Sequence, residues 1–412
     1  MTESKPFEAV ATLPGSPRWD KLTMRPSQLY SRNDDIRSPF ARDYTRILHS
    51  MAYRRLKHKT QVFYNIDNDH ICTRMEHVAH VESVSGTIAK ALGLNTELTK
   101  AISIGHDIGH APFGHKGEEI ISGICQKHLG ESFWHERNGL RIADKVELLR
   151  DNYNISRNLD LTYAVRDGII AHCGEIDENA LKPRDELIDL KDFSAPGKYQ
   201  PATWEGCVVK ISDKIAYVGR DIEDAITLGF LNSEAIDELT HMARANDSEA
   251  LNTTVIMHNL IIDICENSTP DRGITLSDRF LTQLNSVKSF NYKYIYGNKR
   301  FEAFIKYAKL VIDQIFDCLM DTYGGERSWE NIAALKKYCP TLAGAFENSL
   351  AKYCDEGFVP KGELADIARS CQNEKIYGTL SSEKIYAQAI IDYIAGMTDR
   401  FAVKCFDELI SY

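Results

Sequence analysis

The sequence lacks any long hydrophobic run. No segment approaches the roughly 18 consecutive apolar residues of a membrane-spanning helix, and the first residues, Met-Thr-Glu-Ser-Lys, are not followed by an apolar stretch. A secretory signal would need such a stretch behind a basic start. We therefore expect a cytoplasmic protein that has no membrane partner.

Closely spaced cysteines are also missing. Ten cysteines are scattered from Cys72 to Cys405, and the nearest two, Cys339 and Cys354, are fifteen residues apart. The absence of any Cys-x-x-Cys pair argues against zinc fingers and thiol redox motifs. In a chain of this size without a secretion signal, we expect reduced thiols that are mostly buried as small hydrophobic side chains.

The sequence further shows few strand signals and no internal repeat, low-complexity tract or P-loop. Its formal net charge of −10 disfavours a protein whose main task is to coat nucleic acid. Local clusters of Lys and Arg can still bind a phosphate-bearing small substrate or make limited contact with nucleic acid. We therefore leave nucleic-acid binding open and do not predict it.

What the sequence does contain is a strong helical pattern. In residues 78–88, apolar side chains recur at three- and four-residue spacing before a break at Gly93, and Asn95 can cap the next helix. The clearest helix is expected over about 205–228, where six apolar residues step by three or four positions. Such a stripe is typical of a helix face that packs on the core.

The histidines are concentrated in one region. Eight of the thirteen lie between His70 and His135, and residues 105–115 read Gly-His-Asp-Ile-Gly-His-Ala-Pro-Phe-Gly-His. An imidazole next to a carboxylate, as in His106-Asp107, suits a divalent ion that keeps open positions for substrate and water. A capped helix end with a few surface histidines would show the same pattern, so the doublet alone leaves both interpretations open.

Other side chains must complete such a metal site, because adjacent helical residues point about 100° apart. The candidates are His77, on the preceding helix, and Asp213, on the helix at 205–228. Asp213, Tyr217 and Asp221 share one polar face of that helix, a composition suited to binding a metal phosphate. A core histidine and a solvated helix face are the alternative interpretations.

Motifs in several parts of the chain carry a family resemblance. They are Tyr53-Arg54-Arg55-Leu56 with Lys59-Thr60-Gln61-Val62-Phe63, Thr73-Arg74-Met75-Glu76-His77, the segment 105–115, Asp213-Lys214-Ile215-Ala216-Tyr217, and Asp392-Tyr393-Ile394-Ala395-Gly396-Met397-Thr398-Asp399-Arg400. Together they resemble the HD-domain deoxynucleoside triphosphate triphosphohydrolases, which include the dGTPases and the SAM-and-HD-domain dNTPases. The resemblance covers residues from about 37 to 230 and from about 385 to 404.

The resemblance implies an all-α fold, an HD-domain helical bundle with an additional helical C-terminal lobe. Five of the twelve prolines lie in residues 6–39, which predicts an irregular N-terminal arm over 1–36. We expect the HD metal-dependent phosphohydrolase core at 37–232. The helical C-terminal region, 233–412, is expected to complete the nucleotide pocket and to make oligomer contacts.

By the same resemblance, the expected metal ligands are His77, His106, Asp107 and Asp213. Two neutral imidazoles and two carboxylates suit Mn, Fe, Ni, Co or Zn, and they suit Mg less well because Mg prefers an all-oxygen shell. One such divalent ion per site is the cofactor that we expect.

His115, Glu118 and His135 match the family's catalytic group. His115 and Glu118 are three residues apart and share a helical face, so the carboxylate can hold the imidazole in one tautomer and raise its basicity. His135 would support that pair, and we expect His110 to contact side chains of the site without binding the metal or the substrate itself. The alternative interpretation is that these are polar surface side chains without a catalytic role. Some relatives have Asp at the position of Glu118, whose longer side chain carries the carboxylate one methylene further from the backbone.

The resemblance assigns substrate binding to Gln61, Arg74, Lys214, Tyr217 and Asp221. An Arg fork and a Lys point charge are the expected partners of a triphosphate. Asp221 would hold a cation or a sugar hydroxyl, and Gln61 matches the family residue that reads the deoxyribose 3′-hydroxyl. Ordinary surface ion pairs are the alternative for the charged members.

Two groups receive no role from the sequence. Tyr292, Tyr294 and Tyr296 alternate with other residues, so they either line a base pocket or pack in the core. The remaining histidines near the site in sequence or pattern are His70, His80 and His172.

The activity implied is metal-dependent hydrolysis of deoxynucleoside triphosphates, with dGTP as the favoured substrate, to deoxynucleoside and inorganic triphosphate. Relatives form homo-oligomers, often with regulatory nucleotide sites, and both are implied here by analogy alone. The enzymatic alternative is another HD phosphohydrolase, acting on a nucleoside monophosphate or a guanosine polyphosphate. A regulator that senses dNTPs without turnover is the alternative from another class.

Overall fold

The computed structural model describes residues 5–27, 35–64, 68, 70–151, 153–173, 179–244 and 253–411. This part of the chain is predominantly helical, which confirms the all-α prediction, and it divides into two compact units. Unit 1 consists of Met1–Leu48, Gln61–Asp107 and Asp160–Glu302, and unit 2 of His49–Thr60, Ile108–Leu159 and Ala303–Tyr412. Because these segments interleave, the units differ from the linear arm, core and C-terminal region, and that linear division stays a prediction.

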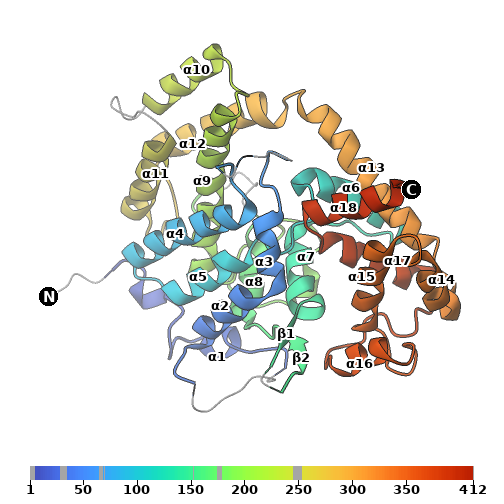
Figure 1. Ribbon diagram of the computed structural model, residues 1–412. Coiled ribbons are helices and arrows are strands. Elements are labelled where there is room, and N and C mark those ends of the chain that lie inside the picture. Colours follow the sequence, from blue (N-terminus) through green and yellow to red (C-terminus); the bar gives the residue numbers. More distant parts are fainter. Residues whose placement is uncertain are drawn as a thin grey trace. The chain divides into compact units, whose positions relative to one another are not determined.

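Figure 1 labels the longer helices of unit 1, which are coloured from blue through green to orange. The helical elements of this unit are η1 (Glu8–Val10), α1 (Trp19–Leu22), α2 (Pro39–His49, which ends on the first residue of unit 2), α4 (Arg74–Leu92), α5 (Thr96–Gly105), α8 (Tyr163–Ala171), η4 (Leu190–Asp192), α9 (Trp204–Thr227), α10 (Ser233–Arg244), α11 (Thr253–Asn267), α12 (Asp278–Asn291) and η5 (Tyr292–Tyr296).

Unit 2 contains the remaining helices and a small antiparallel sheet. They are α3 (Met51–Arg55), η2 (Leu56–His58), α6 (Gly114–His128), α7 (His135–Arg141), η3 (Ile142–Val146), β1 (Leu148–Arg150), β2 (Ser156–Asn158), α13 (Phe301–Met320, which begins two residues before this unit's last segment), η6 (Gly325–Arg327), α14 (Ser328–Leu335), α15 (Pro340–Ala351), α16 (Glu363–Arg369), α17 (Glu383–Ala395) and α18 (Asp399–Ile410). The two strands pair with Leu148 opposite Asn158. No described helix is long and apolar enough to span a bilayer.

Helix α9 is the central element of unit 1 and confirms the helix predicted for 205–228. Its apolar stripe, which includes Val208, Ile215 and Ile222, is buried in the core. The opposite face is not solvated either, because Lys214 and Asp221 are also buried. Since α9 packs against α4, α5, α11 and α12, its polar side chains face other parts of the protein and can form a site.

Helices α4 and α5 carry the first half of the histidine-rich region. A capping box between Thr73 and Glu76 starts α4, and Gly93 ends it with a φ of 87°, a left-handed conformation that suits glycine. Asn95 then caps α5 by accepting hydrogen bonds from the backbone of Glu97 and Leu98. These boundaries agree with the break and the cap that the sequence predicts.

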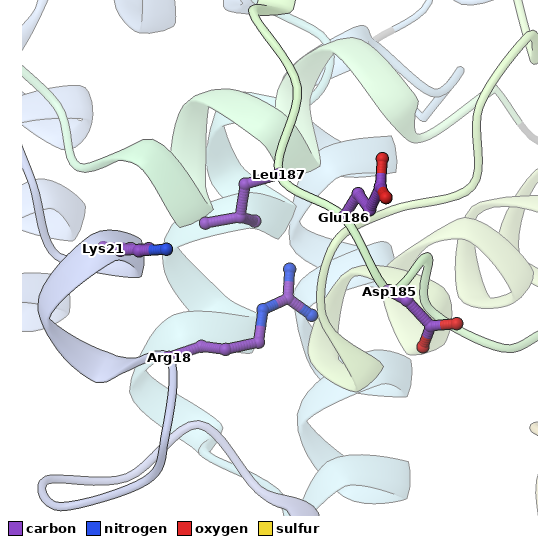
Figure 2. Close-up of a pocket in the computed structure, with 5 residues that line it drawn as sticks. All are labelled: Arg18, Lys21, Asp185, Glu186 and Leu187. Atoms are coloured by element: carbon purple, nitrogen blue, oxygen red, sulfur yellow. The ribbon is translucent and has the colours of Figure 1, made fainter.

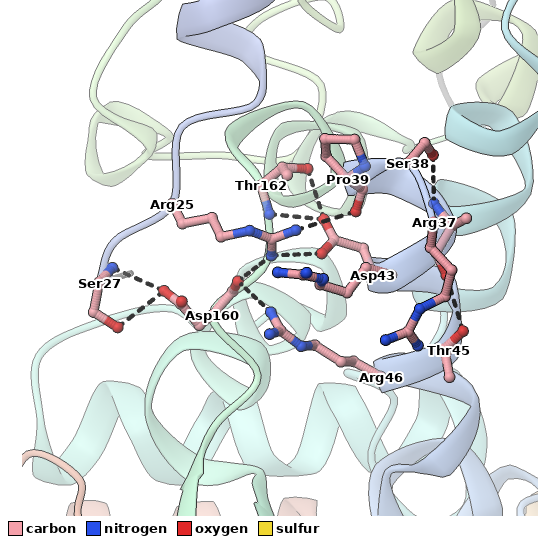
Figure 3. A network of polar contacts seen from close by, with 12 residues as sticks. Arg25, Ser27, Arg37, Ser38, Pro39, Asp43, Thr45, Arg46, Asp160 and Thr162 are labelled. Atoms are coloured by element: carbon pink, nitrogen blue, oxygen red, sulfur yellow. Dashed lines mark hydrogen bonds and ion pairs between the residues drawn. The ribbon is translucent and has the colours of Figure 1, made fainter. Parts of the chain in front are cut away.

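A buried polar network ties the N-terminal segment to α2 and to the segment before α8 (Figure 3). Arg25 donates to the carboxylate of Asp43 at 2.6 Å and to the carbonyl oxygen of Asp160. The second carboxylate oxygen of Asp43 accepts hydrogen bonds from the backbone and the hydroxyl group of Thr162. Asp43 is fully buried, so the network compensates its charge where water does not reach.

Candidate active site

Three of the four expected metal ligands lie together in unit 1. Ligand atoms of His77, His106 and Asp213 all lie within 4.8 Å of one another. Oδ1 of Asp213 is 3.0 Å from Nε2 of His77 and 3.8 Å from Nε2 of His106. Oδ1 of the fourth, Asp107, lies 3.4 Å from the same nitrogen of His106. Helices α4 and α9 and the end of α5 thus converge on one point.

The environment of His106 fits a cation. Nδ1 lies 2.6 Å from the carbonyl oxygen of Ser103, which can only accept, so Nδ1 carries the hydrogen and Nε2 presents its lone pair. His106 is fully buried, and within the described chain Nε2 makes no hydrogen bond. A buried imidazole nitrogen that lies 3.4 and 3.8 Å from the oxygens of two carboxylates matches the donor set of a transition-metal site.

The pKa values of the neighbouring groups reflect their proximity. Burial lowers the pKa of His77, but the hydrogen bond to Asp213 and the charges of Asp213 and Asp107 outweigh this effect and raise it. Burial raises the pKa of Asp213, whereas the hydrogen bond from His77 and the charges of His106 and His77 lower it to about 2. Asp213 is therefore a carboxylate near neutral pH, the form in which it can bind a metal.

Arg74 lies next to this group and makes a buried ion pair with it. Nη1 of Arg74 donates to Oδ2 of Asp107 at 2.9 Å, and both side chains are buried. Nε and Nη2 of Arg74 are buried too and have no hydrogen-bond partner in the described part of the protein. Two buried guanidinium donors without an acceptor indicate an anionic ligand, because leaving them unpaired is costly.

His172 is a member of this region that the sequence did not assign. Its ring lies 4.9 Å from that of His106, and a ligand nitrogen of His172 falls within 4.8 Å of ligand atoms of His106 and Asp107. His172 directly follows α8, three residues after the buried Ile169. This three-residue spacing places His172 on the same core-facing stripe of α8 as Ile169. The spacing is the feature of the sequence from which the burial of His172 could have been predicted.

The expected substrate residues on α9 occupy different environments. Lys214 and Asp221 are buried, and Tyr217 is partly buried. Tyr296, from η5, donates its hydroxyl hydrogen to Oδ2 of Asp221 at 2.5 Å. Burial raises the pKa of Asp221 to about 6, although the hydrogen bond from Tyr296 acts in the opposite direction. One of the three undecided tyrosines thus contacts an expected substrate residue.

Gln61 lies at the start of the second segment of unit 1 and is partly buried. Its side-chain oxygen is buried and has no hydrogen-bond partner among the described residues. The structure therefore does not join Gln61 to Asp221 or to the metal group by a direct hydrogen bond.

The expected catalytic residues meet within unit 2. His115, Glu118 and His135, together with His110, place ligand atoms within 4.8 Å of one another. Oε2 of Glu118 lies 3.0 Å from Nδ1 of His135, 3.7 Å from Nδ1 of His115 and 3.9 Å from Nδ1 of His110. The carboxylate is therefore the centre of a group of three imidazoles.

Glu118 also holds the backbone of this group. Its Oε1 accepts a hydrogen bond from the backbone N–H of His135 at 3.0 Å. Burial raises the pKa of Glu118, but the charge of His135 and the hydrogen bonds of His115 and His135 lower it well below its usual range. Glu118 is thus an anion that can orient an imidazole and stabilise its protonated form.

Gly109 explains how α7 approaches the histidine motif. A Cβ atom at this position would lie 2.0 Å from the carbonyl oxygen of His135 and 2.3 Å from the backbone nitrogen of Gly139. Asn138 donates to the carbonyl oxygen of Gly109 at 2.6 Å. This close approach lets the rings of His110 and His135 stack with 3.8 Å between their centroids.

A separate pocket of about 370 Å³ lies elsewhere in unit 1. Figure 2 shows the Arg18 and Lys21 side chains on one side and the segment 185–187 on the other. Nη1 of Arg18 donates to the carbonyl oxygen of Arg184. The pocket contains none of the site residues expected from the sequence, and its lining carries charges of both signs.

Two family models match the chain. The HD domain matches residues 74–218, and the phosphohydrolase-associated domain matches residues 375–408. The first match includes the expected metal ligands and the histidine group around Glu118. The fold and these matches define the protein as an HD-domain phosphohydrolase.

Curated relatives narrow the class. A deoxyguanosinetriphosphate triphosphohydrolase-like protein of Caldanaerobacter subterraneus subsp. tengcongensis is 32% identical over 91% of this chain and 86% of its own length. A protein of the same name from Clostridium tetani is 34% identical over 69% of this chain and 74% of its own length. Another from Rickettsia bellii is 29% identical over 91% of this chain and 92% of its own length. The chain therefore belongs to the HD-domain dNTP triphosphohydrolase family.

Proposed function

We propose that this protein hydrolyses deoxynucleoside triphosphates, with dGTP as the favoured substrate, to deoxynucleoside and inorganic triphosphate. The observation that carries the proposal is the convergence of His77, His106 and Asp213 within 4.8 Å, beside an Arg74–Asp107 ion pair. The names of the relatives point to the same reaction and the same base.

His77, His106, Asp107 and Asp213 would hold one divalent ion. Two imidazoles and two carboxylates favour Mn, Fe, Ni, Co or Zn over Mg. When bound, such an ion polarises a phosphate oxygen and lowers the pKa of a bound water. The hydrogen bond from Nδ1 of His106 to Ser103 fixes the ring so that Nε2 is the ligand atom.

Arg74 and Lys214 would bind the triphosphate. The buried Nε and Nη2 donors of Arg74 can reach two phosphate oxygens in a fork, and Lys214 adds a point charge. Tyr217 would bind the triphosphate together with these two cations. We assign the sugar to Asp221 and Gln61, whose buried side-chain oxygens Oδ1 and Oε1 make no hydrogen bond among the described residues and can accept one from a hydroxyl.

His115 would transfer a proton during cleavage of the bond between the α-phosphorus and the 5′-oxygen. Glu118 and His135 orient it, and the negative charge of Glu118 stabilises whichever imidazole becomes protonated. His115 either donates a proton to the departing 5′-oxygen or removes one from the attacking water.

Product analysis tests the proposal. Each of the four dNTPs is incubated with Mn or Mg, and the products are separated by chromatography, with His115→Ala as the control. We expect deoxyguanosine and inorganic triphosphate from dGTP, and none from the control. Orthophosphate or pyrophosphate as the product would instead support another HD phosphohydrolase. Tight dNTP binding without turnover under any metal would support the sensor. Mixtures of dNTPs test the predicted regulatory nucleotide.

A further inference from the structure

The turn that joins His110 to α6 has an unusual backbone. Phe113 adopts a φ of 66°, in the left-handed region that bulky side chains rarely occupy, and Gly114 follows with a φ of 61°. A non-glycine residue in such a conformation is strained and persists only where surrounding contacts hold it. Because α6 begins at Gly114, this turn sets where His115 and Glu118 point.

Asp399, the first residue of α18, holds one end of the turn. Its Oδ1 accepts a hydrogen bond from the backbone N–H of Phe113 at 2.9 Å. Its Oδ2 accepts two more from Thr60, from the backbone N–H at 3.0 Å and from the hydroxyl at 2.5 Å. Asp399 is buried, so these charge-assisted hydrogen bonds are not weakened by water.

Lys59 holds the other end. Its side chain is buried, and the ammonium group donates to the backbone carbonyl of His110 and, at 3.0 Å, to that of Ala395. A buried charge persists only with hydrogen-bond partners, so burying this lysine requires both carbonyl oxygens to stay in place. Lys59 and Thr60 are adjacent in the sequence. Residues 59–60 and 395–399 together therefore hold both ends of the turn, through the hydrogen bonds to His110 and Phe113.

We propose that Lys59 and Asp399 are positioning residues that fix the turn at 110–113 and thereby the histidine group around Glu118. The inference rests on the proposed function, because the two residues act on the reaction only through that group. The proposal also assigns a structural role to residues 375–408, which match the phosphohydrolase-associated domain. The Ala395 carbonyl and the Asp399 carboxylate hold the turn that carries the proton-transfer residues.

The test compares Lys59→Met and Asp399→Asn, which keep the size of each side chain, with two matched controls. Lys57→Met, the control for Lys59→Met, changes an exposed lysine two positions from Lys59. Asp407→Asn, the control for Asp399→Asn, changes an exposed aspartate on the same helix as Asp399. For every variant, kcat and KM for dGTP are measured across pH, together with the metal content and the melting temperature.

We expect kcat to fall by about 10- to 100-fold in both variants, because displacements near 1 Å of a catalytic group cost rate of this order. KM and metal content should stay near wild type, and the pH profile of kcat should change, while both controls behave as wild type. A merely structural tie would lower the melting temperature and leave kcat and its pH profile unchanged. That result would overturn the proposal.

A second measurement does not depend on turnover. In protein labelled with 15N-histidine, the imidazole resonances of His110 and His115 should move in Lys59→Met and Asp399→Asn and stay in place in the controls. If the wild type hydrolyses no dNTP but these resonances move, the proposed reaction fails and the positioning role stands. If dGTP is hydrolysed and neither the resonances nor the pH profile change, the positioning role alone fails.

If either variant does not fold, Thr60→Val provides a milder change. It removes only the 2.5 Å hydrogen bond from the Thr60 hydroxyl to Asp399 and keeps the backbone contacts. We expect a smaller movement of the same histidine resonances and a smaller loss of kcat. Resonances and kcat identical to wild type in this folded variant would contradict the proposal.

Discussion

Tyr296 and Asp221 form a buried hydrogen bond of 2.5 Å that joins η5 to the polar face of α9. Burial dominates the behaviour of the carboxylate, because it raises the pKa of Asp221 to about 6 even though Tyr296 favours the charged form. The folded protein therefore binds a proton at Asp221 more tightly than the unfolded chain does.

This raised pKa predicts a pH dependence of stability. As the pH rises from about 4 to about 6, the folded state loses stability relative to the unfolded chain, and the loss levels off above that range. Two pKa units correspond to about 3 kcal/mol. We compare the metal-free Asp221→Asn variant with the metal-free wild type by urea unfolding. As the pH rises from 4 to 7, we expect the free energy of unfolding of the variant to increase relative to that of the wild type by up to this amount. A difference between the two proteins that is independent of pH would contradict the prediction.

Removing a proposed metal ligand should empty the proposed metal site without unfolding the protein. His106→Ala takes away a buried imidazole whose Nε2 lies between Asp107 and Asp213. We expect the metal content of the purified protein, measured by atomic emission, to fall at least about tenfold, since even a lost supporting contact costs this much affinity. His241→Ala, on an exposed position of α10, should retain full metal content. Equal content in both variants would exclude His106 as a ligand.

Neutralising Glu118 should slow the reaction more than it affects folding. Glu118→Gln keeps the shape of the side chain but loses the charge that faces His135 and His115. We expect kcat for dGTP to fall by about 10²- to 10⁴-fold, the usual contribution of general acid–base catalysis. Glu119→Gln, its exposed neighbour on α6, is the control. A wild-type rate in Glu118→Gln would remove Glu118 from the proposed mechanism.

The network in Figure 3 should matter for stability alone. Asp43→Ala leaves the guanidinium of Arg25 without its carboxylate partner, and breaking a buried pair typically costs about 3–5 kcal/mol. We expect a loss of this size in urea unfolding. Lys309→Ala breaks an exposed pair with Asp313 and should change stability by less than about 1 kcal/mol. Similar losses in the two variants would show that burial is not the cause.

The sequence predicted the parts of the structure that local pattern controls. The stripe of Val208, Ile215 and Ile222 and the cap at Asn95 reappear as α9 and α5 because helical periodicity and capping are properties of neighbouring residues. Helix geometry and residue type made His77 and Asp213 candidates to join His106, with other interpretations left open. The family resemblance then assigned the group, since no spacing rule joins residues from three separate helices.

What the sequence did not indicate depends on contacts between distant residues. Lys59 and Asp399 are 340 positions apart, and their hydrogen bonds to the turn at 110–113 leave no periodic trace in the sequence. Tyr296 could not be distinguished from a core tyrosine because its partner, Asp221, lies 75 residues away. Such pairs become visible only when the chain is folded.

Gly109 has a consequence for the variation that this protein can tolerate. Any larger side chain there would meet backbone atoms of His135 and Gly139, which cannot rotate away as side-chain atoms can. Gly123, on α6, has nothing within 4 Å of an added Cβ atom. A saturation library selected for activity should therefore be depleted of every substitution at position 109 while position 123 accepts many amino acids.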